Sequence, residues 1–192
     1  MMEKKTLSLD YNIRPSNLGI EKSKVLFLIH GFGADKNDLF SFASYLPVNF
    51  TVIALEAPHS LPFGGKAWYN IELENGEAVS DIDQAGKSVE TIHSFIQESV
   101  EEYKLNKEEI FVLGFSQGAI LSYGIASKYP EKYKYFLTLS GFAMEEIIEN
   151  SETKDYSNLD FYAAHGTMDG VISIERGRTA KSFLEKQLIK YQ

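Results

Sequence analysis

Four short runs along the chain consist almost entirely of apolar residues. They cover 25–29, 50–55, 110–113 and 135–139, and a slightly more polar run follows at 159–164. Strands that are buried on both faces have this composition, and parallel sheets with helices on each side bury both faces. Residues 6–13 instead alternate between polar and apolar side chains. This alternation predicts a strand with one wet face at the edge of the sheet.

Helical patterns separate these strands. In the longest one the apolar side chains recur about every 3.6 residues, as in an amphipathic helix, and another must end before Pro130 because proline disrupts a helix interior. The predicted helices are 38–46, 81–103, 117–129 and 174–188. Buried strands that alternate with helices predict an α/β fold with a mostly parallel sheet. Residues 56–80 form the longest stretch without a regular pattern, a feature often associated with function.

Size and charge narrow the class of protein. With 192 residues, of which 44% are hydrophobic and 24% charged, the chain is expected to form a single domain over residues 1–192. Its 27 acidic and 19 basic residues give a formal net charge of −8. This charge disfavours nucleic acid or an anionic membrane as a partner, because both are negatively charged.

Several kinds of site and location are disfavoured by what the sequence lacks. The chain contains no cysteine, which excludes disulfides, thiolate metal sites and a cysteine nucleophile. Its N-terminal residues lack the apolar core of a signal peptide, and no apolar run approaches the roughly 18 residues of a membrane-spanning helix. We therefore expect a cytoplasmic protein without a membrane span, and no metal site is predicted.

A serine lies between two glycines at the end of one predicted buried strand. Residues 114–118 read Gly-Phe-Ser-Gln-Gly, directly after the strand 110–113 and at the start of the helix 117–129. In a nucleophile elbow the strand turns sharply into the helix, so the flanking positions must be small, and the helix N-terminus adds a partial positive field. This context predicts that Ser116 is a nucleophile. The alternative is a tight, glycine-lined turn with an incidental serine.

A second glycine-rich turn follows the strand 25–29, where residues 30–33 read His-Gly-Phe-Gly. Such a turn can direct a backbone N–H toward a developing oxyanion, and the residue after the nucleophile usually supplies the second donor. We therefore predict an oxyanion hole formed by the N–H groups of Phe32 and Gln117, each contributing about 3 to 4 kcal/mol. A phosphate-binding loop is the alternative, disfavoured because the sequence lacks both common nucleotide-binding glycine patterns.

An aspartate follows the last of the predicted strands. Residues 165–169 read His-Gly-Thr-Met-Asp, directly after the strand 159–164. A carboxylate on such a loop is well placed to orient a histidine in the chain order Ser, Asp, His. This position predicts Asp169 as the acid of a catalytic triad, and an Asx-turn or helix-cap role is the alternative.

Taken together, these motifs resemble the phospholipase/carboxylesterase family of α/β-hydrolases, which includes acyl-protein thioesterases. The resemblance extends from about residue 7 to the end of the chain, with its motifs in the family's order. The motifs are Leu-Ile-His-Gly-Phe-Gly-Ala-Asp at 28–35, Glu-Ala-Pro at 56–58, Gly-Gly-Lys-Ala-Trp-Tyr at 64–69, Gly-Phe-Ser-Gln-Gly-Ala at 114–119, Leu-Ser-Gly at 139–141 and His-Gly-Thr-Met-Asp at 165–169. Their joint occurrence is far more specific than any single motif.

The resemblance implies an α/β-hydrolase fold with a mostly parallel central sheet flanked by helices. It implies a serine hydrolase without a cofactor, with Ser116 as nucleophile and Asp169 as triad acid. It also implies a substrate pocket at His30, Gly31 and Trp68, with Trp68 as a wall. The residues alone leave other roles open, because His30 is suited to hold its loop and Trp68 to fill the core.

The sequence departs from the family's pattern after Asp169. The family's triad ends with a histidine on the loop after one further strand, and a final helix follows. Here no histidine follows Asp169, and residues 188–192 resemble only the beginning of that strand. The last strand and helix are therefore expected to be missing, which makes the domain short at its C-terminus. A truncated active enzyme and a true inactive homologue both stay open as explanations.

None of the four histidines is expected to replace the missing base. His30 belongs to the oxyanion turn, His59 to the irregular segment and His93 to the middle of a helix, and His165 lies only four residues before Asp169. In a well-studied serine protease, loss of the histidine alone removes about six orders of magnitude in turnover. A chain without this base is therefore expected to be almost silent.

These observations lead to one main hypothesis and two alternatives. The main hypothesis is a serine hydrolase that cleaves carboxylic esters or thioesters of small-molecule substrates through an acyl-enzyme on Ser116. The first alternative is a catalytically inactive module that binds acyl groups, and the second is a flavodoxin-like nucleotide binder. Acyl chain length, ester or thioester preference and homodimer formation stay open.

Overall fold

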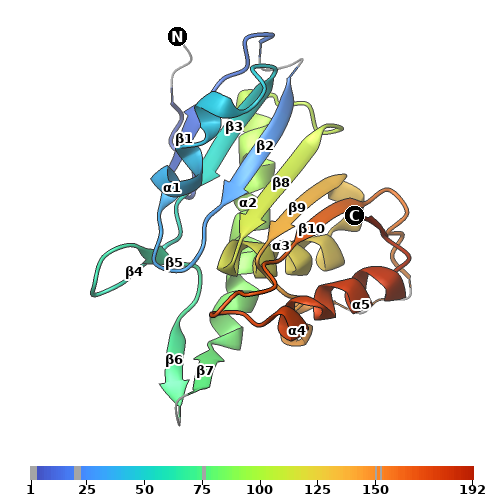
Figure 1. The fold of residues 1–192 in the computed structure, drawn as a ribbon. Helices are drawn as coiled ribbons and strands as arrows, with labels where there is room; N and C mark the ends of the chain where they lie inside the picture. Colours follow the sequence, from blue (N-terminus) through green and yellow to red (C-terminus); the bar gives the residue numbers. More distant parts are fainter. Residues whose placement is uncertain (1–3, 20–22, 75–76, 150, 152) are drawn as a thin grey trace.

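A seven-stranded sheet runs through the computed structural model, which describes residues 4–19, 23–74, 77–149, 151 and 153–192 (Figure 1). The strand order is β1-β3-β2-β8-β9-β10-β11, and all neighbours are parallel except β1, which pairs antiparallel with β3. The strands are β1 (Tyr11–Arg14), β2 (Lys24–Ile29), β3 (Phe50–Leu55), β8 (Ile110–Phe115), β9 (Tyr135–Leu139), β10 (Asp160–Ala164) and β11 (Lys190–Tyr191). The predicted mostly parallel α/β sheet is confirmed.

Helices cover both faces of this sheet. They are α1 (Lys36–Phe40), α2 (Ile82–Tyr103), α3 (Gln117–Lys128), α4 (Ile174–Gly177) and α5 (Thr179–Lys186). Alternate residues of β2 enter different parts of the core: Val25, Phe27 and Ile29 join the large cluster that includes α2 and α3, whereas Leu26 and Leu28 join a smaller cluster on the side of α1. This double burial explains why β2 and β3 are apolar runs without alternation. In β8 and β9 burial on both faces was expected but is incomplete, since their residues mostly alternate between buried and half-buried.

Two predicted helices are interrupted in the structure. The helix expected over 38–46 is the short α1 followed by a separate 3₁₀ turn, Ala43–Tyr45, and none of the residues of α1 is buried. The helix expected over 174–188 is divided at Arg178 into α4 and α5, and Leu188 ends it with a left-handed φ of 55°. Within the described ranges, no helix is long and apolar enough to cross a membrane.

The stretch expected to be irregular, 56–80, contains two small antiparallel sheets. One pairs β4 (His59–Ser60) with β5 (Lys66–Ala67), and the other pairs β6 (Ile71–Glu74) with β7 (Glu77–Ser80). The β6–β7 hairpin extends beyond the end of the main sheet (Figure 1). The Asn-Gly pair at 75–76, between alternating apolar residues, is a hairpin signal that the prediction overlooked; those two residues lie outside the described part of the chain.

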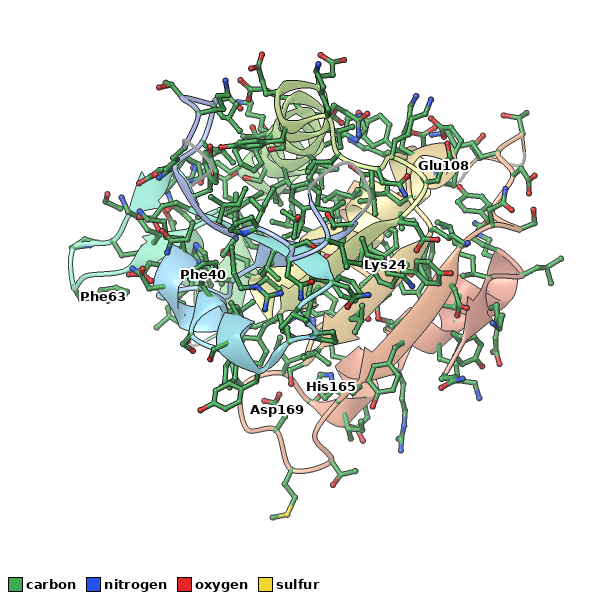
Figure 2. The ribbon with its side chains drawn as sticks, turned by 90° about the horizontal axis from the view of Figure 1, so that it is seen from above. Lys24, Phe40, Phe63, Glu108, His165 and Asp169 are labelled. Atoms are coloured by element: carbon green, nitrogen blue, oxygen red, sulfur yellow. The ribbon has the colours of Figure 1, made fainter. Side chains whose placement is uncertain are left out.

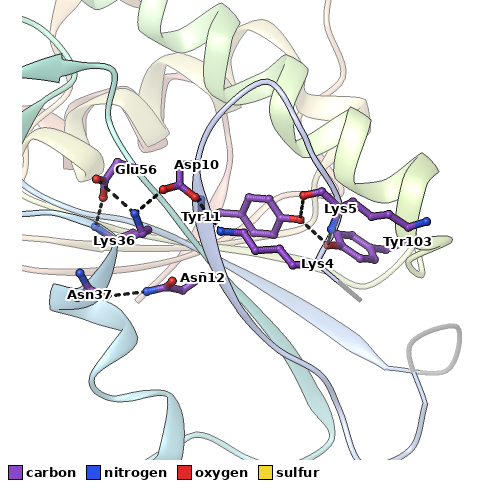
Figure 3. Close-up of polar contacts among 9 residues, drawn as sticks. All are labelled: Lys4, Lys5, Asp10, Tyr11, Asn12, Lys36, Asn37, Glu56 and Tyr103. Atoms are coloured by element: carbon purple, nitrogen blue, oxygen red, sulfur yellow. Dashed lines mark hydrogen bonds and ion pairs between the residues drawn. The ribbon is translucent and has the colours of Figure 1, made fainter. Parts of the chain in front are cut away.

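The N-terminal edge strand is shorter than its polar–apolar alternation predicts. Pairing with β3 begins at Tyr11, and the preceding residues are held by polar contacts instead (Figure 3). Lys36 Nζ lies 2.6 Å from Asp10 Oδ2 and 3.4 Å from Glu56 Oε1, so one ammonium group joins the segment before β1, the start of α1 and the residue after β3. These contacts fix the base of the loop that leaves β2.

Replacing Asp10 by asparagine is expected to destabilise the protein by less than about 1 kcal/mol at pH 7, because this carboxylate is largely exposed and its ion pairs are screened. Hydrogen bonds from Lys36 and Lys4 hold the pKa of Asp10 well below its ordinary value. Because the pKa of Asp10 is lower in the folded protein than in the unfolded chain, the carboxylate stabilises the fold at pH values above its ordinary pKa. This stabilisation is lost as the pH falls through the folded-state pKa.

Urea unfolding of wild type and Asp10→Asn at pH 7 and pH 3 measures this contribution. The difference between the two proteins should shrink at the lower pH and in high salt. An equal difference under all conditions would show that packing, not charge, sets the effect of the substitution.

Candidate active site

The turn from β8 into α3 holds Ser116 in a strained conformation. Its backbone angles are φ 51° and ψ −115°, in the positive-φ region that side chains other than glycine rarely adopt. Hydrogen bonds on both sides fix the turn: Ser116 N–H donates to Leu139 O at 2.9 Å, and Ile120 N–H donates to Ser116 O at 3.0 Å. Such strain, which costs of order 1–3 kcal/mol, concentrates at functional sites.

Close backbone contacts explain both glycines that flank Ser116. A Cβ atom on Gly114 would lie 2.4 Å from Gly118 O, and one on Gly118 would lie 2.1 Å from Ile29 O. Neither backbone neighbour can move without displacing α3 or β2. The Gly-x-Ser-x-Gly pattern is therefore required by the contact between the start of α3 and the ends of β8 and β2.

Substituting Gly118 by alanine is expected to lower the free energy of unfolding by about 1–3 kcal/mol, since overpacking a close contact forces backbone shifts. Gly86 provides the matched control, because it lies in α2 and a Cβ atom there meets nothing within 4 Å. Gly86→Ala should raise stability by about 0.5–1 kcal/mol through helix propensity. Thermal and urea unfolding measure both, and equal effects of the two substitutions would contradict the close-contact explanation.

The glycine turn after β2 lies directly beside the serine. A Cβ atom on Gly31 would be 3.2 Å from Ser116 Cβ. The turn is tied to the β4–β5 region because Gly33 N–H donates to Lys66 O at 2.8 Å and Lys66 N–H donates to Ala34 O at 2.7 Å. The two backbone hydrogen bonds to Lys66 thus hold the segment containing Phe32 in place beside the nucleophile elbow.

One cavity of about 400 Å³ contains most of the predicted site residues. Ser116, Gln117, Phe32 and Asp169 all line it, although they come from three separate loops. The remaining lining residues are Tyr69, Ile71, Ala78, Ser80, Phe115, Ile120, Ser140, Phe142, Val171, Ile172 and Arg176. Most of these are apolar, so the cavity suits an uncharged chain next to a few polar groups.

Three residues expected at the pocket do not line the cavity. Among the described residues that line the cavity, His30, Gly31 and Trp68 are not found. Trp68 is fully buried in the core, where its Nε1–H donates to His30 O at 3.0 Å. The expectation of Trp68 as a pocket wall is corrected: its neighbour Tyr69 lines the cavity instead.

His30 holds its loop, as the residues alone indicated. Its Nδ1–H donates to Gly31 O at 2.8 Å, and its Nε2 accepts from the N–H of Ala57 at 3.1 Å. Burial lowers the pKa of His30. Both ring nitrogens are therefore engaged by backbone groups, and the imidazole is kept neutral.

Gln117 fixes the wall of the site through its side chain. Its Oε1 accepts from the N–H of Trp68 and its Nε2 donates to Tyr69 O, both at 2.8 Å. The first N–H groups of a helix have no partner inside that helix, so the backbone N–H of Gln117 at the start of α3 is available. Within the described chain, the N–H of Phe32 also donates to no protein acceptor.

Asp169 forms the local turn that was considered as its alternative role. Its Oδ1 accepts from the N–H groups of Val171 and Ile172 at 2.8 and 3.0 Å, the local turn expected as the alternative role. These hydrogen bonds lower the pKa of Asp169, so the group is a carboxylate at neutral pH. Its other oxygen, Oδ2, lies 3.6 Å from Nε2 of His165, and Figure 2 shows the two side chains near each other on this loop.

The four histidines all lie outside the cavity of Ser116. Although His165 is close to Asp169, its Nε2–H donates to Ile172 O at 2.8 Å, and the ring lines a second cavity of about 240 Å³. His93 lies on α2, where its Nδ1 is hydrogen-bonded to the hydroxyl group of Tyr133 at 2.8 Å, and His59 belongs to β4. Among the described residues, no group of three or more His, Cys, Asp or Glu side chains is placed to hold a metal ion.

Tyr69 and Arg176 are among the lining residues that sequence reasoning missed. Tyr69 directly follows Trp68, which was expected at the pocket instead. Arg176 lies on α4, seven residues after Asp169, where no motif marks it. The only signal in the sequence is that Arg176 lies in the helix that directly follows the Asp169 loop, close in sequence to a predicted site residue.

Comparisons with known proteins identify the family. A model of the phospholipase/carboxylesterase family matches residues 17–192. Acyl-protein thioesterase 1 of Kluyveromyces lactis is 30% identical over 192 residues, covering 91% of this chain and 82% of its own length. Acyl-protein thioesterase 1 of Candida albicans is 32% identical over 191 residues, covering 91% and 81%.

Solved structures agree with these relatives. The crystal structure of esterase PE8 superposes with a TM-score of 0.82 at 25% identity, covering 96% of this chain and 86% of its own. The carboxylesterase of Bacillus cereus superposes with a TM-score of 0.75 over 96% and 83%, and at 18% identity it shows the shared fold. The chain therefore belongs to the phospholipase/carboxylesterase family, with the α/β-hydrolase fold, and by this resemblance it is a hydrolase of the ester or thioester type.

Proposed function

We propose that this protein is a serine hydrolase that transfers the acyl group of an ester or thioester to Ser116 and then to water. The observation that carries the proposal is the strained elbow. Ser116 has a positive φ, lines an apolar cavity and lies beside the glycine turn, with a Gly31 Cβ position 3.2 Å from its own Cβ. Such strain persists only where the surrounding structure enforces it.

In the proposed reaction, Ser116 Oγ attacks the carbonyl carbon and its proton passes to a base. The carbonyl oxygen becomes an oxyanion that accepts hydrogen bonds from the N–H groups of Phe32 and Gln117. The bond to the leaving oxygen or sulfur then breaks, and the leaving group takes the proton from the base. Water attacks the acyl-enzyme in the same way and releases the carboxylic acid and free Ser116.

Asp169 is proposed to orient the base, an imidazole placed between it and Ser116. Its Oδ1 is occupied by two backbone N–H groups, which leaves Oδ2 to accept from an imidazole N–H. A carboxylate in this role holds the imidazole in the tautomer that can take the serine proton. Since the four histidines of the chain lie outside this cavity, none of them is assigned this step.

Hydrolysis of p-nitrophenyl butyrate tests the role of Ser116. Ser116→Ala should remove all hydrolysis above the uncatalysed rate, whereas Ser182→Ala on α5 should keep the wild-type rate within about twofold, as is usual for exposed surface changes. Equal rates in wild type and Ser116→Ala, both well above the uncatalysed rate, would exclude Ser116 from the mechanism.

A second candidate function is acyl binding without turnover. It is favoured by the position of the four imidazoles outside the cavity, which otherwise retains an apolar wall and N–H donors. Titration with a short fatty acid, combined with the hydrolysis assay, separates the two. Binding accompanied by no Ser116-dependent hydrolysis would favour the binding module over the hydrolase.

A further inference from the structure

An arginine that no motif marks lies in the wall of the Ser116 cavity. Arg176 comes from α4, and its guanidinium carbon lies 3.9 Å from the centroid of the Phe142 ring. Phe142 is buried and follows β9, so it gives the guanidinium group a rigid platform. Stacking of this kind holds a guanidinium plane in place and leaves its edge free to donate hydrogen bonds.

Arg176 lines the Ser116 cavity together with Tyr69 and Phe142. Burial raises the pKa of Tyr69, and the positive charge of Arg176 acts in the opposite direction. The ring contact of Arg176 therefore belongs to the wall of the same cavity as Ser116.

Within the described part of the chain, Arg176 forms no ion pair, although acidic side chains are close in sequence. Glu175 pairs with Arg178 at 3.8 Å. Asp169 uses Oδ1 for its own turn, and its Oδ2 faces His165. The guanidinium edge thus keeps its donors, while the rest of the lining apart from Asp169 carries no charge.

We propose that Arg176 binds an anionic oxygen group of the substrate, a carboxylate or a phosphate, so that the protein favours esters or thioesters that carry a negative charge. This inference rests on the proposed function, because it assigns a specificity-determining residue to the same cavity. A fixed guanidinium suits either group, since its parallel N–H donors match two oxygens at once. The apolar lining then accommodates the uncharged part of the molecule between the anion and the reacting carbonyl.

Binding of small probes tests the proposal without any need for turnover. Monomethyl glutarate carries one carboxylate, and dimethyl glutarate is its neutral counterpart. Calorimetric titration of the full chain should show about tenfold or greater preference for the monoanion, as expected for a hydrogen bond to a charged group. Arg176→Met, which keeps the apolar stem over Phe142, should abolish this preference, and Arg176→Lys should restore part of it.

Arg178 provides the matched control. It lies two residues away, pairs with Glu175 and lines the second cavity. Arg178→Met should therefore leave the preference for the monoanion unchanged. Loss of the preference in Arg178→Met as well, or its retention in Arg176→Met, would overturn the assignment.

Kinetics distinguish the failure of this inference from the failure of the proposed function. For mono-p-nitrophenyl glutarate, Arg176→Met should lower kcat/KM about 10- to 100-fold. For neutral p-nitrophenyl valerate it should change kcat/KM by less than about threefold. Ser116→Ala tests the function because it acts on both esters. An unchanged ratio between them in Arg176→Met excludes only a carboxylate on the acyl side as the group that Arg176 binds.

A third substrate identifies the anion. 1-Butyrylglycerol 3-phosphate places a phosphate on the alcohol side of the ester, whereas the glutarate ester places a carboxylate on the acyl side. Dependence on Arg176 for either substrate supports the proposal and names the group that is bound. Dependence for neither overturns it.

Discussion

Free imidazole is expected to accelerate ester hydrolysis by this protein about 10- to 100-fold, at or below the lower end of the roughly 10²- to 10⁴-fold that a positioned general base contributes. The cavity holds a strained serine, two N–H donors and a carboxylate, but the four imidazole side chains lie elsewhere. A small base diffusing into a cavity of about 400 Å³ can occupy the space beside Ser116. It recovers only part of the activity, since a tethered histidine has a far higher effective concentration.

The measurement is the rate of p-nitrophenyl butyrate hydrolysis against imidazole concentration, after subtraction of the protein-free reaction. The acceleration should saturate and should rise as imidazole loses its proton near neutral pH. In Ser116→Ala the same additions should give only the protein-free rate. Stimulation that persists in Ser116→Ala would mean that imidazole acts away from this serine.

Replacing Asp169 by asparagine is expected to remove most of the acceleration by imidazole. In a serine protease the equivalent change lowers turnover about 10⁴-fold because the imidazole is held in the wrong tautomer. We expect a smaller loss here, about tenfold or more, since the imidazole is not tethered. The asparagine oxygen can still accept from Val171 and Ile172 N–H, so the turn itself should survive.

Asp169→Asn is best compared with Asp160→Asn at matched imidazole concentration. Asp160 lies at the start of β10, pairs with Lys190 and does not line the cavity. Asp160→Asn should keep the full imidazole effect. An undiminished effect in Asp169→Asn, with the protein still folded by circular dichroism, would assign Asp169 to the turn alone.

The central sheet was predictable because its physical cause lies in the sequence. β2 and β3 are buried on both faces, as their consecutive apolar residues indicate, whereas residues of β8 and β9 alternate between buried and half-buried and are less covered than their apolar runs predict. The edge strand β1 was placed correctly but too long. Its alternation continues through residues that are held by Tyr103 and Lys36 rather than by a neighbouring strand.

The candidate site was predictable where backbone geometry restricts the residue type. The glycines around Ser116 are needed because a Cβ atom on Gly118 or Gly114 would lie only 2.1 or 2.4 Å from a backbone oxygen. Side-chain direction was not predictable in the same way. Trp68 and Tyr69 are neighbours and both are buried, and only tertiary contacts decide which one also lines the cavity.

Arg176 shows the same limit of sequence reasoning more clearly. Its α-helix was predicted, but the interruption at Arg178 depends on close packing near His165, where a Cβ atom on Gly177 would meet the ring at 2.6 Å. The guanidinium group of Arg176, on α4, lies over the ring of Phe142, which belongs to the loop after β9. Such contacts between distant segments carry no local pattern.

The most direct test of the nucleophile is to locate the covalent intermediate. Wild-type protein is incubated with p-nitrophenyl acetate and imidazole, quenched with acid and digested, and the peptides are identified by mass spectrometry. An acetyl group on Ser116, lost in Ser116→Ala, is the predicted result. An acetyl group that accumulates on another serine in step with turnover, while Ser116 stays unmodified, would contradict the account.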